Sequence, residues 1–219
     1  MGLLFKLHSG LDRAGSLGLL KSFYNSVKHT HQIDSILTHS KCIVDISNGT
    51  DFDINNRFEV GIGSRPATHP RIGRSKFATR AGSSVSHTGQ NSAQIGPGSV
   101  VHIEGDFSMG DSYINSHARV VCGEKVTIGD GVAIAWNVEI LDDDRHDIII
   151  DGKKSQRRAP IEIQDNVWIG HDVSVHKGVT IHEGSVVASD SVVLSDIPPN
   201  TLAAGNPAEV VRENVDWKP

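Results

Sequence analysis

Aliphatic side chains recur every six residues through the C-terminal half of this 219-residue chain. The longest unbroken series runs Ile163, Ile169, Val175, Ile181, Val187 and Val193. Two residues before its members lie further aliphatic residues, Val167, Val173 and Val179. Alternate side chains therefore point the same way, as in a short β-strand. Because a strand this short buries its apolar side only by stacking on similar strands, the repeat predicts a parallel β-helix, an all-β solenoid of hexapeptide repeats.

The same period extends upstream through Ile128, Ile134 and Ile140, each preceded by a valine two residues earlier. Glycine is abundant, at 22 residues, and aromatic residues make up only 5% of the chain. That composition suits tight corners between stacked strands, where a Cβ is a handicap, and leaves little material for a large helical core. We expect one β-helix domain over residues 41–212, followed by a short tail over 213–219.

Residues 1–40 lack the six-residue period, and we expect them to form a helical cap. Their apolar residues at helical spacing are Leu17, Leu20, Tyr24 and Val27. A cap is needed because the first coil of a solenoid otherwise exposes its apolar cross-section and unpaired strand edges. At the other end, we expect the coil to stop at the proline pair 198–199, since proline lacks the amide hydrogen of a strand ladder.

The rhythm fails between Ile140 and Ile163, which are 23 residues apart and so not a whole number of repeats. The chain must leave the stack there, and we expect an extruded loop over residues 142–160. Long loops on rigid scaffolds often carry binding and catalytic residues, although a solvated surface loop is the simpler alternative. The charged residues and histidine of this loop include Asp142, Asp143, Asp144, His146, Lys153, Lys154, Arg157 and Arg158.

Charge and cysteine content exclude several classes of protein. A net charge of −5 argues against a nucleic-acid-binding surface, which needs a concentrated basic face. The two cysteines, Cys42 and Cys122, are far apart and have no metal-binding spacing, so we expect neither a disulfide framework nor a metal site, and a reducing cytoplasm as the compartment. Polar residues interrupt the apolar N-terminus, so we expect no signal peptide and no membrane span, while peripheral membrane contact stays open.

Three short blocks in the C-terminal half resemble a known family. They are Asn166-Val167-Trp168-Ile169-Gly170, Asp196-Ile197-Pro198-Pro199-Asn200 and Ala204-Gly205-Asn206-Pro207-Ala208. With the repeats, they resemble the left-handed β-helix, hexapeptide-repeat acyltransferases, particularly the sugar O-acetyltransferases of the maltose, galactoside and nodulation-factor types. The resemblance covers about residues 95–212. It implies left-handed coiling, which the spacing alone does not determine.

The resemblance also implies a reaction, the transfer of an acetyl group from acetyl-CoA to a hydroxyl of a sugar or polysaccharide precursor. His146 stands where the family places its general base, and a neutral imidazole can accept the hydroxyl proton. We expect Asp144 to orient that ring and Asp142 to lie near the acceptor, although successive aspartates also suit a polar turn. Asn115 matches a family asparagine that contacts ligand near the acyl group, and a plain asparagine turn is the alternative.

The family's cofactor-lining positions carry over to the terminal coils. They correspond here to Trp168, Gly170, His171, Ala188, Ser189, Leu194, Ser195 and Arg212. Small side chains would let the pantetheine arm approach the backbone, and Arg212 would suit a phosphate. A second basic position of the family is Glu209 here, so the phosphate contacts differ. The resemblance further implies a homotrimer with its sites between subunits.

Other interpretations of the histidines remain open. His69, in Ala67-Thr68-His69-Pro70, resembles the catalytic tetrapeptide of maltose-type enzymes but precedes most of the coils. His176 follows His171 by five residues and precedes His182 by six, and we expect the latter pair to stack on adjacent coils. Such spacing is similar to that of γ-class zinc carbonic anhydrases, but a third histidine expected near Ala135 is absent. A non-catalytic β-helix scaffold is the third alternative.

Overall fold

The computed structural model describes residues 17–18, 20–30, 35–62 and 73–218. His69, the alternative candidate for the catalytic base, lies outside these residues, as does most of the N-terminal segment before the helix. Among the residues that are described, no helix is long and apolar enough to cross a membrane.

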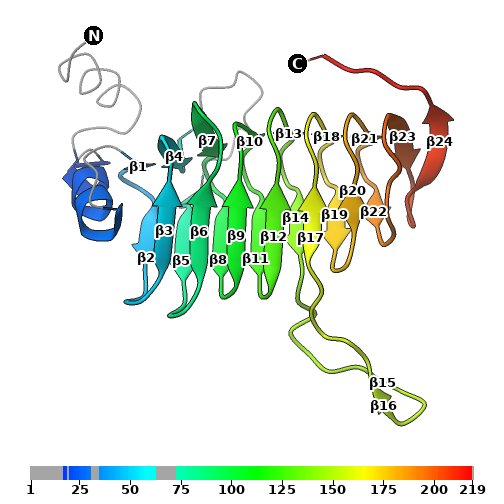
Figure 1. Ribbon diagram of the computed structural model, residues 1–219, viewed down its shortest axis with the longest axis horizontal. Coiled ribbons are helices and arrows are strands. Elements are labelled where there is room, and N and C mark those ends of the chain that lie inside the picture. The colour runs from blue at the N-terminus through cyan, green and yellow to red at the C-terminus, as the bar shows by residue number, and fades with distance from the viewer. Residues whose placement is uncertain (1–16, 19, 31–34, 63–72, 219) are drawn as a thin grey trace.

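Three parallel sheets build the molecule, and the chain passes through them in turn (Figure 1). Sheet A contains β1 (Ile36–Thr38), β4 (Arg57–Val60), β7 (Ser92–Ile95), β10 (Tyr113–Ile114), β13 (Ala133–Ile134), β18 (Trp168–Ile169), β21 (Val186–Val187), β23 (Thr201–Ala204) and β24 (Glu209–Glu213). Sheet B contains β2 (Ile43–Asp45), β5 (Lys76–Thr79), β8 (Val100–Ile103), β11 (Arg119–Cys122), β14 (Glu139–Leu141), β19 (Ser174–His176) and β22 (Val192–Val193). Sheet C contains β3 (Asp51–Ile54), β6 (Ser84–His87), β9 (Asp106–Met109), β12 (Lys125–Ile128), β17 (Ile161–Ile163) and β20 (Thr180–Ile181).

Each coil contributes one strand to each sheet, so each strand pairs with the strand one coil further on. Ile140, for example, lies between Val120 of the preceding coil and Val175 of the next. The predicted core is confirmed, because every member of the series from Ile163 to Val193 is 0% exposed. A six-residue step therefore moves the chain by one face of the prism, and three such steps complete a coil.

Corners between the faces depend on two kinds of residue. On successive coils, the corner from sheet A to sheet B holds Asn137, Asp172 and Asp190 at φ values of 60°, 57° and 61°, a left-handed conformation that Asn and Asp tolerate better than most residues. Gly170 lies at this same corner and is required for a different reason. A Cβ there would lie 2.6 Å from the backbone nitrogen of Ser189, so the close approach of two coils demands glycine.

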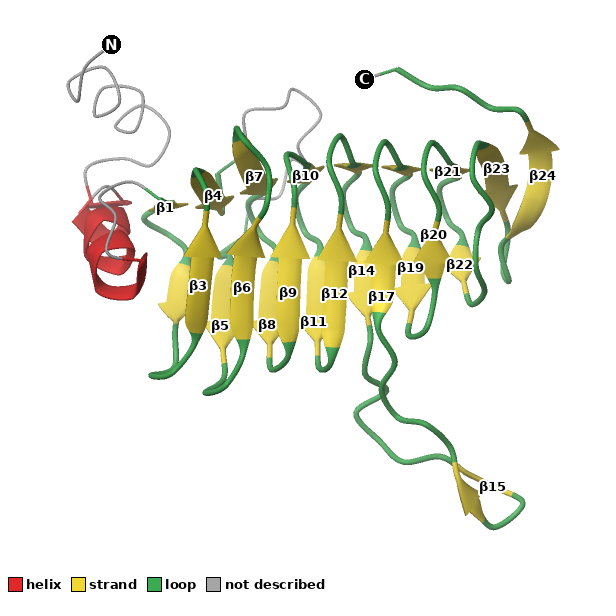
Figure 2. Ribbon diagram, in the orientation of Figure 1, coloured by secondary structure: helices red, strands yellow, loops and turns green. Residues whose placement is uncertain are grey.

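The N-terminal end is covered by a helix described over residues 17–18 and 20–30, which we call the cap helix (Figure 2). It lies beside β1, which begins the coil at Ile36, within the segment expected to be the cap. The apolar residues that predicted the helix do not face the prism: Leu17 is 72% exposed and Leu20 is 70% exposed. The cap helix therefore contacts the prism through the side opposite these residues.

The C-terminal end departs from the expectation that the coil stops at the proline pair. Ile197 forms a parallel bridge with Ile181, and β23 pairs in parallel with β21, so the coil continues for another face. Pro198 and Pro199 lie at the corner between them, where no ladder amide is required. The antiparallel strand β24 then covers the last edge of sheet A.

The expected excursion from the prism is present between β14 and β17. Residues 142–160 leave the stack and end in an antiparallel hairpin of β15 (Ile149–Ile150) and β16 (Lys153–Lys154). The hairpin projects well away from the coils (Figure 1). Pairing resumes at Ile161, opposite Val126 of the preceding coil, so the excursion leaves the register of sheet C intact.

Candidate active site

Asp142 opens the extruded loop and is completely buried. Its carboxylate accepts hydrogen bonds from the backbone N–H groups of Gly123, Glu124 and Lys125 at 2.5, 2.8 and 2.8 Å. Burial raises the pKa of the Asp142 carboxyl, and the three hydrogen bonds partly oppose this change. The side chain secures the turn between β11 and β12 and offers no surface to an acceptor, unlike the substrate contact expected from sequence.

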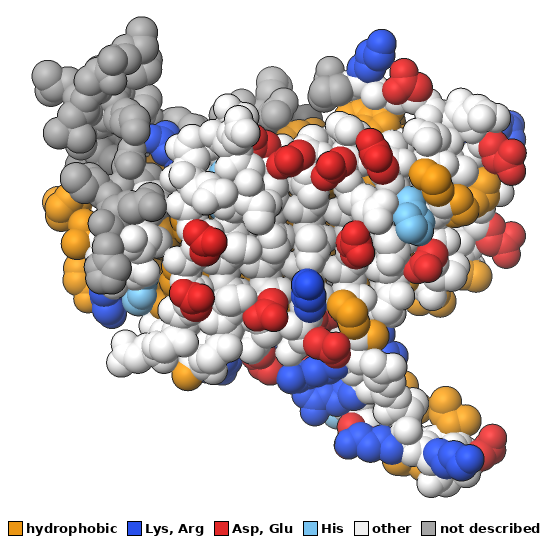
Figure 3. Space-filling model, in the orientation of Figure 1, with side chains coloured by type: hydrophobic (Ala, Val, Ile, Leu, Met, Phe, Trp, Pro, Cys, Tyr) orange, Lys and Arg blue, Asp and Glu red, His pale blue; other side chains and the backbone are white. Residues whose placement is uncertain are grey.

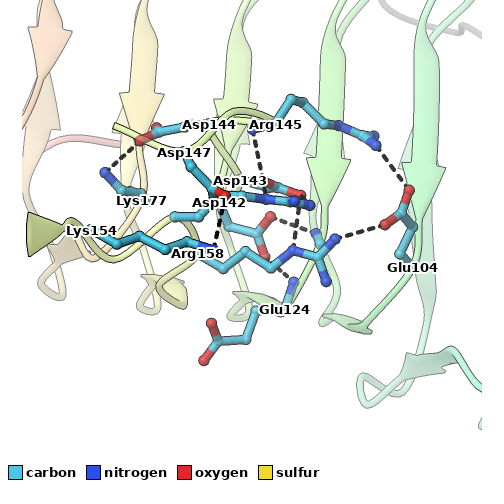
Figure 4. Close-up of polar contacts among 12 residues, drawn as sticks. Glu104, Glu124, Asp142, Asp143, Asp144, Arg145, Asp147, Lys154, Arg158 and Lys177 are labelled. Atoms are coloured by element: carbon cyan, nitrogen blue, oxygen red, sulfur yellow. Dashed lines mark hydrogen bonds and ion pairs between the residues drawn. The ribbon is translucent and has the colours of Figure 1, made fainter. Parts of the chain in front are cut away.

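Asp143 is the centre of an ionic network that sequence analysis did not identify (Figure 4). Its buried carboxylate accepts two hydrogen bonds from Arg157, at 2.8 and 3.1 Å, and one from Nε of Arg158 at 2.9 Å. The backbone N–H of Arg145 donates a fourth at 2.7 Å. Burial disfavours ionisation, but the hydrogen bonds from Arg157, Arg145 and Arg158 hold the pKa of Asp143 well below its usual range.

Glu104 extends this network onto the body of the prism. It lies between β8 and β9, two coils before the loop, and receives hydrogen bonds from Arg145 at 2.9 Å and Arg158 at 2.8 Å. Burial acts against its ionisation, but the hydrogen bonds from His102 and Arg145 lower the pKa of Glu104. The base of the loop is therefore tied to an earlier coil through charged groups. The sequence signal for such a network was that residues 142–160 contain as many acidic as basic residues.

His146 follows directly after this anchored segment. Its side chain is exposed, and among the described residues the ring has no hydrogen-bond partner. Asp144, expected to orient the ring, instead forms an ion pair with Lys177 at 2.8 Å, and its backbone N–H donates to the carbonyl of Arg157 at 3.1 Å. Asp144 thus fixes the loop beside β19, while the imidazole is left accessible.

A second group of predicted residues lies at the corner where sheet A passes into sheet B. Asn115 follows β10, Gly170 and His171 follow β18, and Ala188 and Ser189 follow β21, so these residues occupy one corner on different coils. The Asn115 side-chain oxygen accepts the N–H of the next residue at 2.7 Å. These residues lie just before the N-terminal ends of the sheet B strands, and we call this row the first edge of sheet B.

His171 is held firmly on the first edge. Its ring stacks on Trp136 of the preceding coil, with centroids 4.9 Å apart and planes inclined by 6°. Its Nδ1 lies 2.7 Å from a carboxylate oxygen of Asp172. Ligand atoms of His171, Asp172 and Asp190 come within 4.8 Å of one another, but exposed carboxylates of this kind are common at such corners, and we assign no metal site to them.

The loop and the first edge lie on opposite sides of sheet B. Strands of this sheet begin at the first edge and end at the edge that carries the loop, Lys177, Leu194 and Ser195, which we call the second edge. A single chain therefore does not bring His146 together with Ala188. The six-residue period predicts that both residues belong to one prism. It does not predict that the strands of sheet B separate them.

The remaining predicted cofactor residues belong to sheet A. Trp168 of β18 is 45% exposed, and its ring centroid lies 6.0 Å from that of Trp217 in the C-terminal segment. Trp217 is itself held by a hydrogen bond of 2.6 Å from its indole N–H to the carbonyl of Asn166. Arg212 is exposed on β24 and donates to the neighbouring carbonyl of Val211 at 2.6 Å.

The expected stacking of His176 on His182 is wrong. Six residues correspond to one face, so His176 lies on sheet B opposite Leu141, whereas His182 follows β20 of sheet C. The Nδ1 atom of His182 is 3.2 Å from the side-chain oxygen of Gln164. The six-residue spacing of His176 and His182 therefore does not produce the stacked pair that could have bound a metal.

Comparisons with known proteins agree with this architecture. A family model described as bacterial transferase hexapeptide (six repeats) matches residues 160–195. Galactoside O-acetyltransferase of Escherichia coli (strain K12) is 42% identical over 118 residues, 53% of this chain and 55% of that protein. Nodulation protein L of Rhizobium meliloti (strain 1021) is 38% identical over 130 residues, 53% of this chain and 68% of that protein.

Among solved structures, that of the polySia-specific acetyltransferase NeuO has the same fold, with a TM-score of 0.50 and 23% identity, over 84% of this chain and 88% of NeuO. The chain belongs to the hexapeptide-repeat acyltransferase family. It spans about half the length of the first curated relatives it matches, 55% in the case of the galactoside enzyme.

Proposed function

We propose that this protein is an acetyl-CoA-dependent O-acetyltransferase that acts on a hydroxyl of a sugar or polysaccharide precursor. The observation that carries the proposal is the 42% identity with galactoside O-acetyltransferase, in a chain whose extruded loop presents an exposed histidine. The proposal includes left-handed coiling, as the family resemblance implies, and a cytoplasmic location.

His146 is the proposed general base. A ring nitrogen accepts the proton of the acceptor hydroxyl while the hydroxyl oxygen attacks the thioester carbonyl carbon, and the carbon–sulfur bond of acetyl-CoA then breaks. The leaving thiolate of CoA takes up a proton, so the products are the acetyl ester and free CoA. An accessible imidazole that makes no hydrogen bond to any described residue is suited to this task, and the anchored segment before it keeps its backbone in place.

The first edge suits the extended pantetheine arm of acetyl-CoA. Its corners follow one another from coil to coil at about 4.8 Å, the spacing of paired strands. Ala188 and Ser189 are small, and neither blocks access to the backbone at the corner. On sheet A, the exposed guanidinium of Arg212 is the predicted group that can bind a phosphate.

A complete site requires two copies of the chain, because His146 and the first edge lie on opposite sides of sheet B. We propose a homotrimer of parallel prisms, in which the loop of one subunit faces the first edge of its neighbour. Each trimer then holds equivalent sites in the crevices between subunits.

Release of free CoA thiol from acetyl-CoA tests the proposal directly, with sugars, amino sugars and nucleotide sugars offered as acceptors. His146→Ala should lower kcat by about 10²- to 10⁴-fold, the usual contribution of a general base. His182→Ala is the matched control, since that histidine lies at a different corner, and it should retain activity. Full activity of His146→Ala would remove the assigned base, and zinc-dependent formation of bicarbonate in place of thiol release would favour a carbonic anhydrase.

A further inference from the structure

The cap helix turns its apolar side away from the protein. Its large hydrophobic residues recur at intervals of three and four, which places them on one side of a helix. All are well exposed: Leu17 at 72%, Leu20 at 70%, Phe23 at 54%, Tyr24 at 60% and Val27 at 42%. In Figure 3, hydrophobic side chains gather at the end of the molecule where this helix lies. We call these residues the apolar stripe.

The opposite side of the cap helix is polar and buried. Ser22 is 4% exposed and Ser26 is 0% exposed. The Ser26 hydroxyl accepts the N–H of Ile36 at 2.9 Å and lies 3.0 Å from its carbonyl, and the Ser22 hydroxyl accepts the N–H of Thr38 at 2.8 Å. Ile36 and Thr38 belong to β1, the edge strand of sheet A, so serine hydroxyls satisfy backbone groups that no further strand pairs.

This arrangement explains why the helix does not rotate to bury its leucines. Turning the apolar stripe inward would remove the serine hydroxyls from β1 and leave buried backbone groups unsatisfied, at a cost of about 1–3 kcal/mol for each group. The hydrogen bonds therefore set the orientation of the helix, and the stripe remains exposed.

Positive charge lies beside the stripe. The described residues of the cap helix include Lys21 and Lys28 and no acidic residue, and Lys28 Nζ lies 5.5 Å above the ring of Tyr24. Lys21 also joins Lys41 and Arg74 in the lining of a pocket of about 430 Å³ that contains no acidic residue. In a chain of net charge −5, the described part of the cap helix and this pocket are locally basic, while the exposed carboxylates of the first coil, Asp45, Asp51 and Asp53, belong to β2 and β3.

We propose that the N-terminal end of the prism docks on an anionic lipid surface. The apolar stripe enters the boundary between headgroups and acyl chains, and Lys28, Lys41 and Arg74 face lipid phosphates. An exposed apolar side containing aromatic residues, flanked by lysines, is the pattern of helices that lie in a membrane interface. Pairing of two cap helices is less suitable, because it brings lysines together with no acidic residue on the described helix to compensate.

Flotation of the full-length protein with lipid vesicles tests the proposal. Vesicles of phosphatidylcholine mixed equally with phosphatidylglycerol should bind the protein, and vesicles of phosphatidylcholine alone should bind it more weakly. The double variant Leu20→Ser with Phe23→Ser should reduce binding by at least about tenfold, since two side chains no longer enter the apolar region. Val211→Ser, similarly exposed at 43% on β24 at the other end, should bind like the wild type.

A second double variant, Lys41→Gln with Arg74→Gln, tests the basic pocket without altering the cap helix. Each lost charge should weaken binding to the anionic vesicles by about fivefold, with no effect on neutral vesicles. This variant also decides the matter if the serine variant fails to fold by circular dichroism. The proposal is overturned if the wild type ignores anionic vesicles, or if the serine variant changes only the oligomeric mass in solution, which would identify the stripe as a contact between copies.

Discussion

Three consecutive aspartates at the base of the loop have three different environments. Asp142 accepts backbone N–H groups in the interior, Asp143 binds two arginines, and Asp144 pairs with the ammonium of Lys177. None contacts the ring of His146 through a hydrogen bond among the described residues. Their combined effect is to fix the backbone that leads to His146, and the proposed role of general base needs such a fixed position.

Loss of the Asp143 charge should loosen the loop. In Asp143→Asn, Arg157 and Arg158 lose a buried anionic partner, and hydrogen bonds to charged groups contribute about 1.5–3 kcal/mol each. We expect amide hydrogen exchange over residues 142–160 to accelerate by at least about tenfold. Asp147→Asn is the control in the same loop, since its pair with Lys154 is exposed to solvent and such pairs contribute little.

The pH dependence of this protection follows from the lowered pKa of Asp143. A carboxyl whose pKa is lower in the folded than in the unfolded protein stabilises the fold above its unfolded pKa, and the effect disappears as the pH falls through the folded value. The protection factors of the loop should therefore stay constant from neutral to mildly acidic pH and fall only in strong acid. A loop that exchanges equally in wild type and Asp143→Asn would contradict this role.

At the scale of the elements, the corners rather than the strands limit what can be substituted. Gly170→Ala places a Cβ 2.6 Å from the backbone nitrogen and 2.9 Å from the Cα of Ser189. Neither atom belongs to a flexible side chain, so one coil must shift relative to the next. Overpacking of this kind costs about 1–3 kcal/mol, which urea unfolding should detect.

Gly73→Ala provides the matched control for this substitution. A Cβ at Gly73 would meet no atom within 4 Å, so the alanine should leave the free energy of unfolding within about 1 kcal/mol of the wild type, on the stabilising side. Equal stabilities of the two alanine variants would mean that the coils adjust to a side chain at Gly170.

The strands were predictable because the six-residue period is a local property of the sequence. It identifies Ile169 and Val187 as inward-facing without knowledge of which coils they contact, and both are buried. The loop was predictable from a break in the period. The arginine side chains that pair with Asp143 and Glu104 were not, since these ion pairs join residues 14 to 54 positions apart. The orientation of the cap helix could not be predicted either, because helical spacing identifies an apolar side but does not show whether that side is buried.

At the scale of the whole molecule, the separation of His146 from the first edge by sheet B predicts complementation between defective subunits. A His146→Ala subunit keeps an intact first edge, and a Ser189→Trp subunit, whose bulky ring obstructs that edge, keeps an intact loop. Each variant alone should be inactive in the thiol-release assay. After co-expression, mixed oligomers should form some sites from the intact loop of one subunit and the intact edge of its neighbour.

Random mixing of equal amounts sets the expected recovery. Half of the loops and half of the edges are intact and are drawn independently, so about a quarter of the sites should combine two intact halves and about a quarter of the wild-type activity should return. If loop and edge of the same chain formed the site, every site would contain one defect and mixing would restore nothing. Mixing the two purified homo-oligomers without dissociation is the control, and it should also show no recovery.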